Sequence, residues 1–186
     1  METTAFRSEN IVVNIMVGAA LGLITGFAGA MMVPLLPYYD LFYTISGGVC
    51  FGLGFGLWSK WRFGLGYLGV LLLICLTSAF YYAAVFTTIM ARDIIKFGPE
   101  LVILGAIGGS LGAFLVVVLT AIILPNARKF NAIAIVVIVG AIAGGAVLPG
   151  VIDLKPEYYS IMLLQMGWQA PVMAALFAVL VMGERR

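Results

Sequence analysis

Long apolar stretches alternate with short polar segments along the whole chain. Six of these stretches are rich in aliphatic residues, Phe and Gly, and they cover about 11–33, 41–58, 66–91, 101–124, 131–151 and 158–183. A helix needs about 20 such residues to cross a bilayer, and lipid offers no partners for the backbone polar groups of open conformations. The pattern therefore predicts an all-α polytopic membrane protein with six transmembrane helices and short loops, which forms a single integral membrane domain over residues 1–186.

The composition agrees with this class of protein. Hydrophobic residues make up 63% of the chain and charged residues 10%, whereas a soluble domain carries about 25% charged residues. The first ten residues, METTAFRSEN, are polar, and no small-residue cleavage site follows a short apolar core, so we expect no signal peptide. The net charge of +2 offers no basic surface, which argues against a nucleic-acid partner.

Basic residues are concentrated in alternate connecting segments. Seven of the ten lie before the first span, between spans two and three, between spans four and five, or after the last span: Arg7, Lys60, Arg62, Arg128, Lys129, Arg185 and Arg186. The opposite segments hold three basic residues among five acidic ones. The positive-inside rule therefore places both termini in the cytoplasm, and we expect the bilayer to be a bacterial cytoplasmic (inner) membrane.

The residue types inside the predicted spans limit the chemistry. The chain has no histidine, which excludes haem ligation by His, imidazole base catalysis and His-rich metal sites. Asp, Glu, Lys and Arg lie only near span ends, which argues against a proton relay and against an intramembrane hydrolase. We expect no enzyme activity, no cofactor and no metal site, and we read Asp40 and Asp153 as solvated charges at the outer rim.

Neutral polar and aromatic residues occur mainly in the outer half of the predicted bundle. Amide and hydroxyl groups can orient a small neutral ligand, and aromatic rings supply contact area. The alternative is that these groups only join neighbouring helices, each hydrogen bond contributing about 0.6 kcal/mol. The candidate substrate contacts on the third and sixth spans share one helix face each: Thr77, Tyr81 and Thr88 on the third, and Gln165, Trp168 and Gln169, before Pro171, on the sixth. The first span adds Asn14 and Thr25.

Glycines at helical spacing form narrow faces on four predicted spans. Such faces let a neighbouring backbone approach closely, whether it belongs to this chain or to another. The predicted packing glycines are Gly18, Gly22 and Gly26 on the first span, Gly48, Gly52 and Gly56 on the second, Gly105 and Gly109 on the fourth, and Gly140 and Gly144 on the fifth. On the second span, Gly47 and Gly54 lie on a face about 150° away, which predicts close neighbours on two sides.

The six short-looped spans, with both ends inside and a small-residue face on the first, resemble the substrate-binding subunits of energy-coupling-factor vitamin transporters. The resemblance covers the topology of the whole chain and implies capture of a solute, but it rests on no shared motif. The long outer loop that often covers the ligand in that family is missing after the first span here. No site residue is therefore carried over from the family.

Two functions remain open. The first is a small integral membrane transport protein, either a carrier or channel subunit or a substrate-binding subunit, for a neutral or weakly polar solute. It predicts an outward-facing cavity near Gln165 and Gln169. The second is a non-catalytic subunit of a larger membrane complex, which binds other membrane subunits or further copies of itself through its glycine faces. It predicts a flat small-residue surface and no cavity.

Overall fold

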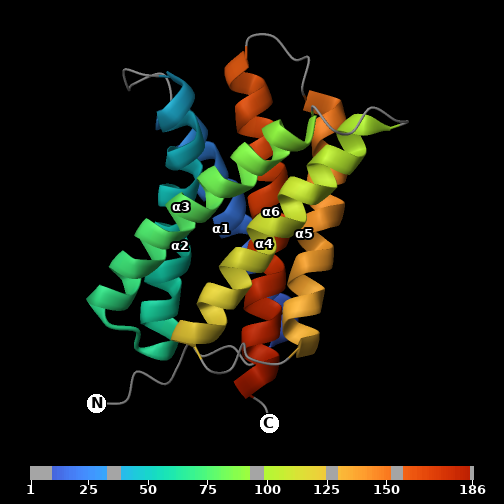
Figure 1. Ribbon diagram of the computed structural model, residues 1–186. Coiled ribbons are helices and arrows are strands. Elements are labelled where there is room, and N and C mark those ends of the chain that lie inside the picture. Colours follow the sequence, from blue (N-terminus) through green and yellow to red (C-terminus); the bar gives the residue numbers. More distant parts are fainter. Residues whose placement is uncertain (1–9, 33–38, 93–98, 125–129, 152–156, 185–186) are drawn as a thin grey trace, which may run out of the picture.

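Six α-helices make up almost all of the described chain (Figure 1). The structure is a computed structural model that describes residues 10–32, 39–92, 99–124, 130–151 and 157–184, without the side chains of 39–44, 92, 130, 151, 157, 158 and 184. Successive helices run in opposite directions, so the first and last described residues lie at the same end. The helices are α1 (Ile11–Met32), α2 (Tyr39–Phe63), α3 (Tyr67–Arg92), α4 (Glu100–Ile123), α5 (Phe130–Val151) and α6 (Glu157–Glu184).

The helices begin and end within two residues of the predicted spans, except at the end of α2. This helix continues to Phe63, five residues beyond its predicted end, because Ser59 and Lys60 interrupt the apolar pattern without interrupting the backbone hydrogen bonds. Gly64 then ends the helix with a φ of 73°, a conformation that favours glycine, and its N–H donates to the carbonyl of Lys60 at 3.0 Å.

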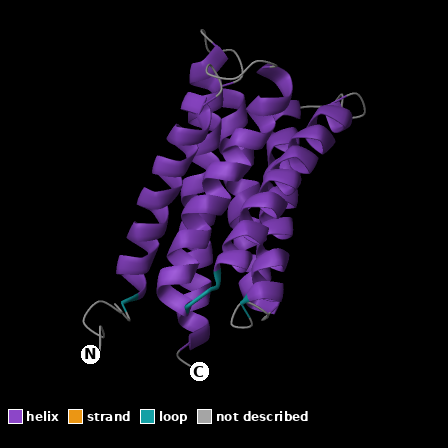
Figure 2. Ribbon diagram, turned by 90° about the vertical axis from the view of Figure 1, so that its left-hand side faces the viewer, coloured by secondary structure: helices purple, strands orange, loops and turns teal. Residues whose placement is uncertain are grey.

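Each helix packs against its neighbours in the chain, and α6 closes the bundle by packing against α1 (Figures 1 and 2). α6 also contacts α2 and α4. It is the most deeply buried of the helices that can span a membrane, with 61% of its most apolar window inside the bundle. Side chains on different faces of α6 therefore meet most of the other helices.

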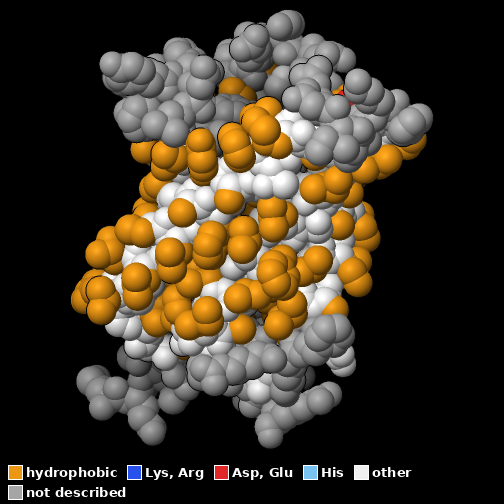
Figure 3. Space-filling model, viewed as in Figure 1, with side chains coloured by type: hydrophobic (Ala, Val, Ile, Leu, Met, Phe, Trp, Pro, Cys, Tyr) orange, Lys and Arg blue, Asp and Glu red, His pale blue; other side chains and the backbone are white. Residues whose placement is uncertain are grey.

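The outside of the bundle is apolar. Large hydrophobic side chains cover the middle of the face shown in Figure 3. Five of the described helices are long and apolar enough to cross a membrane, namely those over 11–32, 67–91, 100–123, 131–150 and 159–183. A continuous apolar surface of this kind is unfavourable in water, so these helices identify an integral membrane protein. α2 is not among the five; it contains five glycines and ends with Lys60 and Arg62 in its last turn.

Large aromatic side chains fill the end of the bundle where the described chain begins and ends. Phe177 of α6 stacks on Trp58 of α2 with 3.5 Å between ring centroids, and the ring centroids of Phe55 and Phe177 are 6.2 Å apart. All three side chains are buried. These rings fill the interior of the bundle at that end.

Glycines bring α1 into backbone contact with α6. A Cβ atom at Gly22 would lie 2.5 Å from the Cα atom of Ala170, a distance that real Cβ atoms essentially never show. Gly18 and Gly26, one turn away on either side, approach α6 nearly as closely. Close approach of this kind gives the van der Waals contact that holds helices together in lipid.

The remaining predicted packing glycines also face helices of this chain. Gly105 and Gly109 of α4 lie against Gly144 and Gly140 of α5, backbone to backbone. α2 has close neighbours on two sides: Gly48, Gly52 and Gly56 face α3, Gly54 faces Thr25 of α1, and Gly47 faces Gln165 of α6 and Tyr81 of α3. The glycine faces are therefore occupied within the bundle.

Candidate functional site

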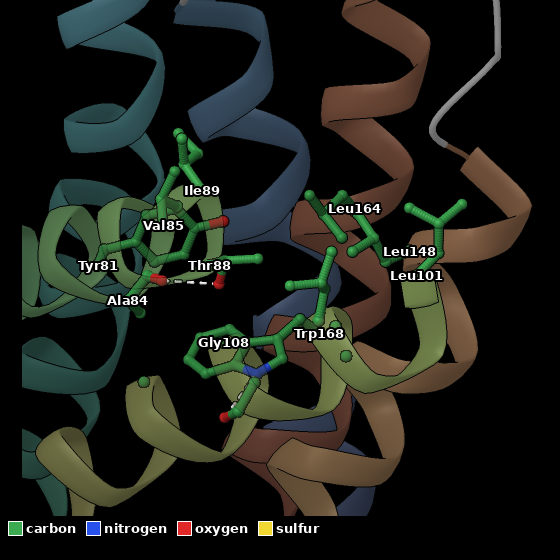
Figure 4. A pocket seen from close by; sticks show the side chains of 15 residues that line it. Tyr81, Ala84, Val85, Thr88, Ile89, Leu101, Gly108, Leu148, Leu164 and Trp168 are labelled. Carbon is green, nitrogen blue, oxygen red and sulfur yellow. Dashed lines mark hydrogen bonds between the residues drawn. The ribbon is translucent and has the colours of Figure 1, made fainter. Parts of the chain in front are cut away.

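A cavity of about 270 Å³ lies between α3, α4, α5 and α6 (Figure 4). Its lining runs from Tyr81 to Ile89 on α3 and from Leu101 to Gly112 on α4, so it lies toward the end where α3 ends and α4 begins. Ile89 is 56% exposed and lies at the rim of the cavity. The walls are mainly aliphatic side chains and glycine backbone, which favours a ligand with an apolar body.

Three side chains bring hydrogen-bonding groups to the cavity: Tyr81, Thr88 and Trp168. Thr88 Oγ1 donates to the carbonyl of Ala84 at 2.8 Å, and Trp168 Nε1 donates to the carbonyl of Gly109 at 3.2 Å. The rings of Tyr81 and Trp168 meet edge to face, with centroids 5.9 Å apart, a favourable arrangement for an aromatic pair. With both of those donors engaged, Thr88 and Trp168 offer a ligand a hydroxyl acceptor and ring surface.

Glycines on α4 create much of this space. Gly108 lies opposite Thr88, and a Cβ atom at Gly112 would lie 3.0 Å from Cζ2 of Trp168. The bare backbone here lets the indole ring lie against α4. Gly105 and Gly109, which pack against α5, line the same cavity. The α4 glycines therefore both hold α5 in place and shape the cavity.

A second polar group lies on another face of α6. The Gln169 side chain is fully buried; its Nε2 donates to the carbonyl of Gly47 at 3.1 Å, and its Oε1 accepts from Thr25 Oγ1 at 2.8 Å. The carboxamide thus joins α1, α2 and α6, and each of its polar atoms has a partner. This arrangement fits a structural role, since interhelical hydrogen bonds in lipid stabilise by about 0.6 kcal/mol each.

Gln165, one turn from Gln169, differs in its bonding. Its side chain is 2% exposed, yet its Oε1 has no hydrogen-bond partner among the residues that the structure describes. Glycines make room for it: a Cβ atom at Gly29 would lie 2.6 Å from this oxygen, and one at Gly47 would lie 3.0 Å from Gln165 Cδ. A buried polar atom without a partner costs about 1–3 kcal/mol, so this side chain requires an explanation.

The structure does not bring the eight predicted contacts into one pocket. Tyr81, Thr88 and Trp168 line the cavity, whereas Thr77 borders a neighbouring void of about 10 Å³, where its Oγ1 donates to the carbonyl of Gly48 at 2.9 Å. The other polar residues lie elsewhere. Gln165 and Gln169 face α1 and α2, and Gln169 bonds to Thr25 of α1. Asn14 lies near the start of α1, where its Nδ2 donates to the Asn10 carbonyl at 2.9 Å.

The difference has a geometric cause. Successive residues of an α-helix point about 100° apart, so Leu164 and Trp168 face the cavity while Gln165 and Gln169 face α1 and α2. The pattern on α6 identifies a polar face but not the helix that lies opposite it. It also misses the apolar lining residues, such as Val85, because an aliphatic residue in a membrane span carries no distinctive signal.

The helices define an integral membrane protein, and its bundle contains a small cavity between α3, α4, α5 and α6. Comparisons with protein families, with curated proteins and with solved structures find no match to this chain. Within the described ranges, no group of three or more His, Cys, Asp or Glu residues is placed to hold a metal ion.

Proposed function

We propose that this chain is a small integral membrane transport protein, acting as a carrier or channel subunit or as a substrate-binding subunit. Its solute is small, neutral and largely apolar. The observation that carries the proposal is the cavity of about 270 Å³ with apolar walls and three hydrogen-bonding side chains. Drug-sized ligands occupy pockets of about 300–1,000 Å³, so the solute is smaller than these. The described lining residues carry no carboxylate, amine or imidazole, in keeping with binding rather than catalysis.

We further propose six membrane spans, with α2 as the sixth, and both termini in the cytoplasm of a bacterial inner membrane. The 25 residues of α2 extend about 37 Å, more than the ~30 Å hydrocarbon core, and the helix packs between α1 and α3. Lys60 and Arg62 lie at the aromatic-filled end of the bundle, which the positive-inside rule favours as the cytoplasmic end. The cavity then faces the outer side.

The alternative, a subunit that assembles through its glycine faces, has less support. The predicted packing glycines all face helices of the same chain, so these faces have no room for a partner. Assembly with other membrane subunits or with further copies would have to use the larger apolar side chains outside the bundle, such as those of Met16 and Ile24 on α1.

Binding of a brominated probe to the cavity is expected to quench the fluorescence of Trp168. We expect 4-bromobenzyl alcohol, added to the protein in detergent, to quench saturably in a variant that keeps this tryptophan alone, with Trp58→Phe and Trp61→Phe. The reason is that the indole ring lines the cavity. If the double substitution prevents folding, the difference in emission between wild type and Trp168→Phe reports the same contact.

Val85→Phe tests whether the probe binds in the cavity, because Val85 lines the cavity and a phenyl ring there would occupy the space of the probe. We expect this substitution to raise the Kd at least tenfold, which corresponds to about 1.4 kcal/mol. Val118→Phe on α4 is the matched control, because Val118 is also half-buried but lies outside the lining, and it should leave the Kd unchanged. Quenching that does not saturate and that Val85→Phe does not change would contradict the proposed function.

A further inference from the structure

Gln165 carries a buried acceptor that no group in the described part of the bundle satisfies. Its Oε1 has no hydrogen-bond partner there, although the side chain is only 2% exposed. One turn away, the corresponding oxygen of Gln169 accepts from Thr25 at 2.8 Å. The bundle therefore pairs one carboxamide fully and leaves the carbonyl of the other for an N–H or O–H from elsewhere.

Tyr81 lies between this carboxamide and the cavity. Its ring lines the cavity and meets the Trp168 ring edge to face. A Cβ atom placed on Gly47 would lie 3.1 Å from Tyr81 Cζ and 3.0 Å from Gln165 Nε2, so the phenol end and the carboxamide flank the same point on α2. Tyr81 is half-buried, and its side chain has to adopt another rotamer for a ligand in the cavity to reach Gln165.

We propose that the solute is a neutral amphipathic molecule whose apolar body fills the cavity and whose hydroxyl or N–H group donates to Gln165 Oε1. This inference rests on the proposed function, because it assigns the polar end of the same solute. Among the residues that the structure describes, no charged side chain lines the cavity, and the neighbouring groups on α1, α2 and α6 are carboxamides, a hydroxyl and glycine backbone. An ionised ligand would lose its hydration here without a counter-charge, which selects a neutral donor.

Two probes that differ in one donor test the assignment. 4-Bromobenzyl alcohol can donate to Gln165, whereas 4-bromobenzyl methyl ether has the same brominated ring and cannot. With Trp168 quenching as the readout, and both probes corrected for partition into detergent, we expect the alcohol to bind about tenfold more tightly, as one well-formed buried hydrogen bond allows.

Gln165→Leu is expected to weaken alcohol binding about tenfold and to leave ether binding unchanged. The substitution keeps a similar side-chain volume and breaks no hydrogen bond that the structure shows, so the protein should fold. If Gln165→Leu does not fold, Gln165→Met replaces it in the same measurement. Gln169→Leu is the matched control, since it removes a carboxamide one turn away that is already paired. It should lower stability yet retain the preference for the alcohol.

The outcomes separate the two proposals. Equal affinity for alcohol and ether in the wild type, or a preference for the alcohol that remains in Gln165→Leu, would overturn the role of Gln165. Saturable binding in the same experiment would still support the cavity as the binding site. Absence of saturable quenching by either probe would overturn the proposed function itself.

Discussion

Gly22→Ala is expected to destabilise the protein by about 1–3 kcal/mol or more. The new methyl group would lie 2.5 Å from Ala170 Cα and equally close to the Gln169 carbonyl oxygen, both of them backbone atoms that cannot rotate away. α1 and α6 must therefore move apart, which also stretches the hydrogen bond from Thr25 to Gln169. The free energy of unfolding in mixed micelles, with sodium dodecyl sulfate as denaturant and circular dichroism as readout, measures the loss.

Gly150→Ala is the control for Gly22→Ala. In the described part of the chain no atom lies within 4 Å of a Cβ atom at Gly150, so stability should change by no more than about 0.5 kcal/mol. Equal effects of the two substitutions would show that α1 and α6 are not in backbone contact.

Gly144→Ala should reduce both stability and probe binding. Gly144 of α5 lies against the carbonyl of Gly105 on α4, and both residues line the cavity. A methyl group there pushes α4 away, with a cost of about 1–3 kcal/mol from overpacking, and displaces one wall of the cavity. Chemical unfolding and Trp168 quenching by 4-bromobenzyl alcohol measure the two effects in the same sample.

Gly145→Ala separates this effect from a general intolerance of α5 to alanine. A Cβ atom at the adjacent position would lie 3.1 Å from the carbonyl oxygen of Val102, a contact that a small adjustment relieves. Gly145 does not line the cavity, so its substitution should cost less stability and leave probe binding intact. A larger loss at Gly145 than at Gly144 would contradict the described register of α4 and α5.

The helices were predictable because a membrane helix needs a long apolar run and short polar connections, and both are plain in this chain. The end of α2 was not, since the hydropathy falls at Ser59 while the backbone continues to Gly64, where a left-handed residue ends the helix. Spacing alone also grouped the α2 glycines into two faces, but only the structure identifies α3 on one side and α1 and α6 on the other.

The candidate site was predictable in part. Tyr81, Thr88 and Trp168 combine polarity with aromatic area on helix faces, which is a signal that sequence alone carries, and they line the cavity. The spacing of Gln165 and Gln169 could not reveal that they face α1 and α2, because helix periodicity does not fix the neighbours of a helix. The glycine face of α4 was predicted as a packing face, and the structure shows that the same glycines also line the cavity.

Labelling of a single cysteine tests most directly whether the cavity is an outward-facing binding site. In a chain with Cys50→Ala and Cys75→Ala, Thr88→Cys places a thiol in the cavity lining, while Phe86→Cys places one on the exposed face of α3 as the control. We expect a membrane-impermeant charged thiosulfonate to modify Thr88→Cys from the outside of right-side-out vesicles, and 4-bromobenzyl alcohol to slow that reaction. Phe86→Cys, on the exposed apolar face of α3, should react slowly, and the probe should not change its rate of modification. Modification of Thr88→Cys only from the cytoplasmic side, or at a rate that the probe does not change, would contradict an outward-facing binding cavity.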